Sequence, residues 1–288
     1  MTQKILRPKI DFVFKLLFGD TRNTDILEAF LKAALDIPGE EYRKLVTADP
    51  FLKRENEEDK TGILDVKVYT TSGMVIDVEI QLVASRELRN RIVLYAARML
   101  TEQLKRGADW AAGRVISIII VDDILVLEEE AYYNKYGLNN KKSGKPFTGL
   151  IEINILELPK LPREDNGDRL WAWGQFLKAE KAEEFAMVAE KAPEVKRAVA
   201  RLMELSEDER NRMMAEKREI WLTDMHNIKK ESIEKGLAEG RATGLAEGRA
   251  TGRAEAALEI ARKMKALGDT VEKIMQVTGF SREVIENA

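Results

Sequence analysis

The sequence contains no cysteine among its 288 residues. Disulfide bonds, thiolate zinc sites and cysteine nucleophiles are therefore excluded, and the composition fits a reducing cytoplasm. Histidine is nearly absent as well, because His226 in the polar stretch TDMHNIKKE is the only one. A single histidine cannot build a histidine-rich metal site, and it has no evident catalytic partners, so we expect His226 to be a surface residue.

Long apolar segments are also missing. The longest apolar run is Val115–Val121, with the sequence VISIIIV, whereas about 20 residues are needed to span a bilayer. The first residues, MTQKILRPKI, lack the apolar stretch of a signal peptide. From these features we expect a soluble cytoplasmic protein that has no membrane partner.

Charged residues are abundant and nearly balanced. They make up 34% of the chain beside 44% hydrophobic residues, and the net charge is −3. The hydrophobic content is sufficient for a large core. A protein that coats nucleic acid is usually basic, so any contact with nucleic acid must use a local patch of positive charge.

The apolar patterns of the first 162 residues predict a mixed sheet flanked by helices. The first helix ends at Gly19, and the strand at Val115–Val121 is apolar enough to be buried on both faces. The expected helices span residues 9–18, 25–35 and 86–106, and the expected strands span 63–70, 74–82, 115–121 and 150–158.

The strand signal stops after Pro162, and residues 168–225 are predicted to be helical, with breaks near Pro193 and at an N-cap on Ser206. Four parts of the chain are therefore expected. They are a core at 1–162, a helical extension at 163–227, a glycine-repeat helix or tether at 228–268, and a short helical hairpin at 269–288.

An internal repeat marks the third part. GLAEGRAT occurs at 236–243 and again at 244–251, so that glycine recurs every four residues. Each glycine inside a helix costs about 1 kcal/mol relative to alanine. Two interpretations remain open, which are a close helix–helix contact in a homo-oligomer and a mobile tether. For the terminal hairpin, a small structural cap is favoured over a helix-turn-helix DNA reader, because its second helix is very short.

The stretch LDVKVYTTSGMVIDVEIQ, residues 64–81, predicts a β-hairpin. A three-residue loop with Gly73 in the left-handed position places apolar side chains opposite one another on one face of the two strands. On the other face the same register pairs Lys67 with Asp77, and it places Asp65 directly opposite Glu79. Like charges opposed across a sheet repel.

Two explanations account for this opposition of acids. In the first, the face is solvated and water screens the two carboxylates. Alternatively a divalent cation lies between them, since Mg²⁺ prefers one or two carboxylates together with waters and a phosphate oxygen. Gln81 lies beside Glu79 on the same face, where it could hold an attacking water.

Asp65 followed by Glu79-Ile80-Gln81 resembles the D…(D/E)-x-K core of the PD-(D/E)XK nuclease superfamily. More narrowly, the chain is similar to the Rpn family of recombination-promoting nucleases, also called PD-(D/E)XK nuclease family transposases. The ordered matches are KIDFVFKLLFGD (9–20), DKTGILDVKV (59–68), IDVEIQ (76–81), RNRIVLYAARMLTEQLKRG (89–107), INILEL (153–158) with Lys160, and the tail GLAEGRATG with TGFS.

The resemblance implies a restriction-endonuclease-like α/β fold with a helical C-terminal extension. It also implies a Mg²⁺- or Mn²⁺-dependent endonuclease that hydrolyses DNA and is linked to recombination or transposon-type mobility. Asp65 and Glu79 would hold the metal, and Gln81 stands where the superfamily usually has lysine. Asp11 would be an additional acid of the site, unless it is only a surface charge of the first helix.

Because Gln81 is uncharged, another residue would have to meet the charge of the transition state. Lys67 is the first candidate and Lys60 the second, although Lys67 would equally serve as the cross-strand partner of Asp77. Residues 86–114 carry seven Lys/Arg against three Asp/Glu. From this segment Arg89, Arg91 and Arg98 are expected to contact DNA, unless the helix only has a solvated basic face.

Three other functions remain open for such a sequence. The first is a nuclease-like protein that binds DNA and cleaves it weakly or not at all, which the glutamine and the acidic net charge favour. The second is an oligomeric structural protein that acts through the glycine-repeat helix. The third is a remnant that has neither activity.

Overall fold

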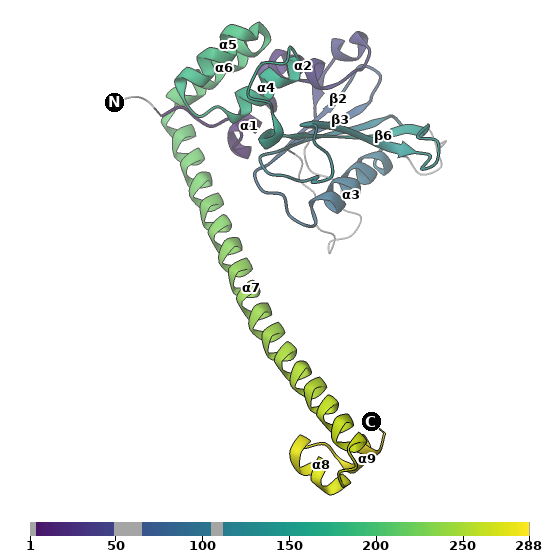
Figure 1. Cartoon of the computed structure of the whole chain (residues 1–288). Helices are drawn as coiled ribbons and strands as arrows, with labels where there is room; N and C mark the ends of the chain where they lie inside the picture. Colours follow the sequence, from purple (N-terminus) through teal and green to yellow (C-terminus); the bar gives the residue numbers. More distant parts are fainter. Residues whose placement is uncertain (1–3, 49–64, 105–111, 288) are drawn as a thin grey trace. The chain divides into compact units, whose positions relative to one another are not determined.

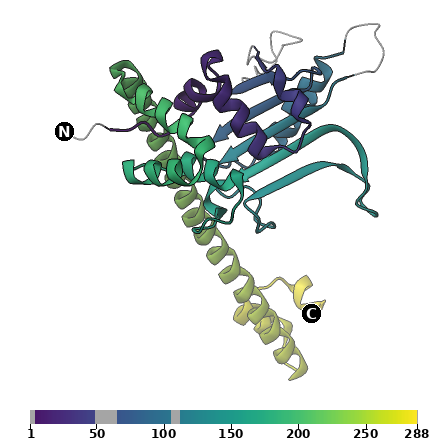
Figure 2. The ribbon, with the colours of Figure 1, turned by 90° about the horizontal axis from the view of Figure 1, so that it is seen from above.

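The computed structural model describes residues 4–48, 65–104 and 112–287. The chain divides into two compact units, Met1–Ile220 and Trp221–Ala288. In the first unit helices cover both faces of a central sheet (Figures 1 and 2). Its strands are β1 (Val46–Thr47), β2 (Val66–Tyr69), β3 (Val75–Gln81), β4 (Val115–Val121), β5 (Tyr133–Asn139) and β6 (Pro146–Glu157). The helices of the whole chain are α1 (Asp11–Phe18), α2 (Thr24–Ala34), α3 (Leu88–Thr101), α4 (Arg169–Lys178), α5 (Ala182–Lys191), α6 (Pro193–Glu207), α7 (Glu209–Ala266), α8 (Val271–Thr278) and α9 (Arg282–Glu286).

The sheet is mixed, with the strand order β1-β2-β3-β4-β6-β5 within the described residues. Strands β3, β4 and β6 are parallel to one another, and the outer pairs are antiparallel. The predicted mixed sheet between helices is therefore confirmed. Strands β1 and β5 were not predicted, because β1 has only two residues and β5, YNKYGLN, is polar and largely exposed. Strand β6 also begins earlier than predicted, at Pro146.

An aromatic core holds α1, α2, α4 and α5 together on one face of the sheet. Phe18, Phe30 and Trp173 lie within 6 Å of one another between ring centroids, and Phe176 and Phe185 continue the contacts into α5. All five rings are fully buried. The helices that follow Pro162 thus pack against the first two helices of the chain within the first unit.

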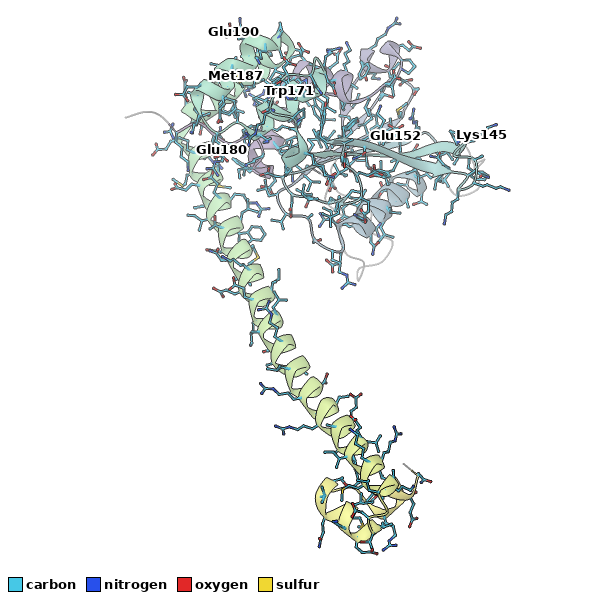
Figure 3. All side chains as sticks on the ribbon, in the orientation of Figure 1. Lys145, Glu152, Trp171, Glu180, Met187 and Glu190 are labelled. Atoms are coloured by element: carbon cyan, nitrogen blue, oxygen red, sulfur yellow. The ribbon has the colours of Figure 1, made fainter. Side chains whose placement is uncertain are left out.

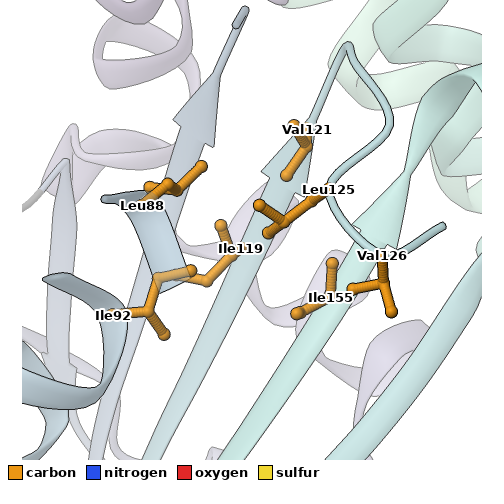
Figure 4. Close-up of a cluster of buried hydrophobic side chains, with 7 residues drawn as sticks. All are labelled: Leu88, Ile92, Ile119, Val121, Leu125, Val126 and Ile155. Carbon is orange, nitrogen blue, oxygen red and sulfur yellow. The ribbon is translucent and has the colours of Figure 1, made fainter. Parts of the chain in front are cut away.

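Helix α3 covers the opposite face of the sheet. Figure 4 shows the buried side chains that fix it there, which come from α3, β4, β6 and the loop after β4. They are Leu88, Ile92, Ile119, Val121, Leu125, Val126 and Ile155. A second cluster packs Ala96 and Met99 against Val75 and Val115. Between these two clusters α3 lies over the face of β3 that carries the acids.

The predicted register of the β2–β3 hairpin is confirmed. Val66 pairs with Val78, Lys67 with Asp77 and Val68 with Ile76. Gly73 has a φ of 86°, the left-handed conformation that the three-residue loop requires. Leu64 and Lys60 lie outside the described residues.

The predicted N-cap at Ser206 is wrong. Ser206 lies inside α6, where its hydroxyl donates to the carbonyl of Leu202 and accepts the backbone N–H of Leu6. The turn into α7 is made instead by Asp208, whose carboxylate accepts the N–H of Asn211. Aspartate is as good a cap as serine, and the buried N-terminal segment recruits the serine hydroxyl.

In the second unit the glycine repeat is helical, within α7. No atom outside the helix lies within 4 Å of a Cβ placed on any of its five glycines. Helices α8 and α9 fold back on the end of α7, where Ile274 and Ile285 bury Ala261. This is the arrangement of a small cap. The side chain of His226 lies outside the described residues. Among the helices of the described residues, none combines the length and hydrophobicity needed to cross a bilayer.

Candidate active site

Glu79 is the most confined acid of the hairpin. It follows Asp77 on the face of β3 that α3 covers, and its side chain is buried because the two apolar clusters close around it. Its Oε1 atom has no hydrogen-bond partner in the described part of the chain. A buried carboxylate oxygen without a partner is costly, so it is a position where a proton or a cation is favoured.

The electrostatics of Glu79 follow from this burial. Loss of solvation and then repulsion by Asp65 raise the pKa of Glu79 to about 7. The charges of Arg91 and Lys15 act in the opposite direction. Glu79 therefore changes its charge near neutral pH, and a bound cation would favour its ionised form.

Asp65 immediately precedes β2, and its charge repels the Glu79 carboxylate. Its Oδ2 accepts the backbone N–H of Ile80 at 2.9 Å, and its Oδ1 forms an ion pair with Lys15 Nζ at 3.1 Å. Burial raises the pKa of Asp65, and the Ile80 N–H and Lys15 partly offset that rise. Asp65 and Glu79 are thus near enough for their charges to repel, and the structure adds a lysine from α1.

Gln81 continues the same face of β3. Arg91 Nη2 donates to Gln81 Oε1 at 2.8 Å, and the guanidinium lies 6.0 Å from the centroid of the Tyr95 ring. This bond orients the amide so that its nitrogen points elsewhere, and that nitrogen bonds to no other described residue. The Gln81 amide group is therefore held in place and retains donors for a water or a phosphate oxygen.

Lys67 and Asp77 lie on this face of the hairpin, but their side chains differ in their contacts. The Lys67 ammonium is buried and pairs with Glu102 Oε2 at 3.1 Å, at the end of α3. Asp77 is opposite Lys67 in the register, yet its Oδ1 has no partner among the described residues. Burial, followed by repulsion from Glu79 and Asp65, raises the pKa of Asp77 well above its usual value.

Asp11 lies on α1, one turn before Lys15. Arg218 binds it with two bonds, from Nε to Oδ1 at 2.8 Å and from Nη2 to Oδ2 at 2.6 Å. Repulsion by Asp11 contributes to the raised pKa of Asp65, so the two carboxylates interact electrostatically. Because Arg218 binds both carboxylate oxygens of Asp11, we expect Asp11 to support the candidate site indirectly, whereas Asp65 is expected to be part of it.

The three arginines expected to contact DNA differ in their surroundings. Arg91 holds Gln81, as described. Arg89 donates to the carbonyl of Leu125 at 3.1 Å and pairs with Glu128, so it ties α3 to the loop after β4. Arg98 lies half-buried on α3. Arg91 is therefore bonded directly to a residue of the candidate site.

Sequence reasoning missed two residues of this site, Lys15 and Asp77. The signal for Lys15 was its spacing of four from Asp11, which places both residues on one face of a helix. The signal for Asp77 was its spacing of two from Glu79, which places both on one face of a strand. Neither spacing predicts which other helix or strand each side chain contacts.

The chemistry of these groups fits a divalent cation. Asp65 and Glu79 are two interacting carboxylates with hard oxygen atoms, and Glu79 Oε1 is buried without a partner among the described residues. No third acid or histidine joins them in a cluster within the described ranges. The pair is therefore a partial ligand set, of the kind Mg²⁺ takes when waters and substrate oxygens complete it.

The mixed six-stranded sheet flanked by helices, with interacting acids on the β2–β3 hairpin, is a restriction-endonuclease-like fold. A sequence model described as PD-(D/E)XK nuclease family transposase matches residues 8–232. The chain belongs to this family, as its motifs indicated. No curated protein and no solved structure matches it.

Proposed function

We propose that the protein is a Mg²⁺- or Mn²⁺-dependent endonuclease that hydrolyses phosphodiester bonds of DNA in the cytoplasm. The observation that carries the proposal is the buried, unpartnered carboxylate oxygen of Glu79 beside Asp65. Membership in a family described as transposases supports the further proposal that the cleavage serves recombination or transposon-type mobility.

The residues of the chain divide the work as follows. Asp65 and Glu79 would hold the cation, which when bound polarises the phosphodiester and lowers the pKa of a water. Lys15 supplies positive charge next to Asp65, in the role that the superfamily lysine has and that Gln81 cannot fill. Arg91 fixes the Gln81 amide, whose N–H groups orient the attacking water.

A second candidate is a protein that binds DNA through this fold without cleaving it. The observation that favours it is Gln81, because an amide carries no charge to stabilise the transition state. Lys67 does not compensate for this, since Glu102 neutralises it. The two candidates differ in whether a divalent cation is required.

A plasmid-cleavage assay separates them. Supercoiled DNA is incubated with the full chain in Mg²⁺, Mn²⁺, Ca²⁺ or EDTA, and nicked and linear products are followed over time. The variants are Glu79→Ala and Asp65→Asn. Glu183→Ala is the matched control, because Glu183 is an exposed acid on α5.

We expect cleavage by the wild type and by Glu183→Ala in Mg²⁺ or Mn²⁺ alone, and a loss of at least about 100-fold in both site variants. A parallel thermal melt should show that Mg²⁺ stabilises the wild type and not Glu79→Ala. Cleavage by the site variants at the wild-type rate would exclude this site as the active centre. Binding of DNA without cleavage under every condition would favour the second candidate.

A further inference from the structure

Strands β5 and β6 continue beyond the sheet as a two-stranded ribbon, which we call the β-arm (residues 137–150). In both ribbon views it extends away from the helices of the first unit, and Figure 3 labels Lys145 at its end and Glu152 nearer the sheet. Every residue from Gly137 to Phe147 is exposed. Both faces of the ribbon are thus uncovered in the first unit, and a two-stranded ribbon is only marginally stable by itself.

The tip of the β-arm is nevertheless built to hold one shape. Asn140 Oδ1 accepts the N–H groups of Lys142 and Ser143, both at 2.9 Å, and the N–H of Asn140 donates to the carbonyl of Lys145 at 2.8 Å. Gly144 takes the left-handed conformation with a φ of 70°. These bonds present the lysines of the turn in a defined arrangement at the end of the ribbon.

The charge of this region differs from that of the rest of the molecule. Residues 131–151 contain four lysines and no acidic residue, in a chain whose net charge is −3. The four are Lys135, Lys141, Lys142 and Lys145, and all are exposed. Across the described ranges none of them forms an ion pair. They are available to a polyanion.

The β-arm also exposes apolar side chains. Phe147 is 86% exposed and Leu138 is 50% exposed. Lysines with an interspersed aromatic ring are suited to duplex DNA, because the major groove admits a two-stranded ribbon and a ring can contact thymine methyl groups or sugars. A ribbon that pairs with another protein would more often have an edge without adjacent lysines, because lysines on an edge strand discourage such pairing.

The β-arm lies at the opposite end of the sheet from the carboxylate site. Glu79 is level with Ile155 of β6, through Ile119 of β4, and the strand runs back from there to Pro146. Nine residues of strand span about 30 Å at 3.3 Å per residue. That length corresponds to roughly nine base pairs, since each adds about 3.4 Å.

We propose that the β-arm is a second DNA-binding element, which contacts the phosphates of duplex DNA through Lys141, Lys142 and Lys145 about nine base pairs from the carboxylate site. The proposal rests on the proposed function in taking DNA as the ligand. It differs from that function in assigning affinity to residues that hold no metal and touch no reacting atom.

The test measures binding of the full chain to a fluorescent 30-base-pair duplex by anisotropy, in Ca²⁺ and at 50 to 200 mM NaCl. The variant is K141Q/K142Q/K145Q, and the charge-matched control is K44Q/K196Q/K217Q, which removes three exposed lysines outside the β-arm. We expect the arm variant to bind on the order of 10- to 100-fold more weakly at 100 mM salt. The slope of log K against log salt should fall by about 2 to 3, at about 0.9 per phosphate contact, while the control keeps the wild-type slope.

Phe147→Ala provides a second, uncharged measurement, and we expect weaker binding with an unchanged salt slope. An arm variant that binds like the control, or a wild type that binds no duplex, would overturn the proposal. So would a change in molar mass by light scattering in the arm variant, because the β-arm would then serve self-association.

A plasmid-cleavage assay on the same samples keeps the two proposals distinct. A wild type that binds through the β-arm and does not cleave disproves the nuclease and leaves the β-arm assignment standing. A wild type that cleaves, with an arm variant of undiminished affinity, leaves the nuclease and disproves the β-arm assignment.

Discussion

At the residue scale, Glu79 has a position that is unfavourable for an ionised carboxylate. Its carboxylate is buried between apolar clusters and faces Asp65, and no described group donates a hydrogen bond to its Oε1. Such a group destabilises the folded chain when it is ionised, unless a proton or a cation joins it. The stability of the protein should therefore report on the state of this one side chain.

Removal of the Glu79 charge should stabilise the metal-free chain at high pH. Because the folded-state pKa is about 7 and the ordinary value is 4.5, stability falls as the pH rises from about 4.5 through 7. We expect Glu79→Gln to have a free energy of unfolding up to about 3 kcal/mol higher at pH 8, with the gap closing towards pH 5. Urea unfolding in EDTA at several pH values measures this. Glu183→Gln should show no such trend, and a gap that is the same at pH 5 and pH 8 would contradict the prediction.

Lys15 is the other residue whose position is decisive, because its ammonium lies 3.1 Å from Asp65. Substitution by methionine should lower the single-turnover cleavage rate by roughly tenfold to a hundredfold, through loss of positive charge near the phosphate. The same change raises the pKa of Asp65 further, so the rise of activity with pH should move to higher pH.

Lys15→Arg should restore part of the rate, and Lys196→Met serves as a surface control. A rate that drops without any movement of the pH profile would indicate a structural role for Lys15 only.

At the element scale, the helices determine where the site residues can reach. Helix α3 is clamped by its apolar contacts so that Arg91 meets Gln81, and α1 is held by the aromatic core so that Lys15 meets Asp65. The aromatic core depends in turn on a close approach of α4 to the chain after β6. There a Cβ on Gly174 would lie 2.5 Å from Leu161 Cδ1.

Gly174→Ala should therefore destabilise the first unit. The added methyl group overlaps a buried leucine, which costs about 1 to 3 kcal/mol in a tightly packed interior. Thermal or urea unfolding measures the loss, and Gly39→Ala is the control, since a Cβ there meets no atom within 4 Å.

The double variant Gly174→Ala/Leu161→Ala relieves the overlap. Its loss in free energy of unfolding should therefore be smaller than the sum of the losses in the two single variants. Strictly additive effects would show that the two residues are not in conflict.

At the scale of the whole molecule, the candidate site belongs to one of the two units. The described partners of Asp65, Gln81 and Asp11 all lie in the first unit, and Arg218 is the last of these partners in the sequence. Within the described residues of the second unit, no atom outside the helix lies within 4 Å of a Cβ placed on a glycine of the repeat. We therefore predict that the candidate site and the glycine repeat can be separated along the sequence.

Deletion of residues 228–288 should leave metal-dependent cleavage within about threefold of the full chain, because all contacts of the site are retained. Plasmid nicking measures this, and light scattering of both chains shows whether the glycine repeat carries self-association. A truncated chain that is folded by circular dichroism but inactive would show that the second unit takes part in catalysis.

The sequence by itself determined the hairpin and its acids. Alternation with period two and a loop closed by Gly73 left one register that pairs apolar with apolar residues, and that register opposed Asp65 and Glu79. These features are local, since both strands lie within twenty residues of each other. The same locality made the first helices, the buried strand β4 and the family motifs recognisable.

Only the tertiary structure decided which charges meet the site. Lys15 and Arg218 lie on helices that are far from the hairpin in the sequence, and Arg91 lies on the helix that follows the hairpin. Lys67 turned to Glu102 although the hairpin placed it opposite Asp77. Ion pairs form with whichever partner the packed helices bring within reach, and packing depends on the whole core. A residue's periodicity fixes the face on which it lies, but the partner on that face comes from elsewhere in the fold.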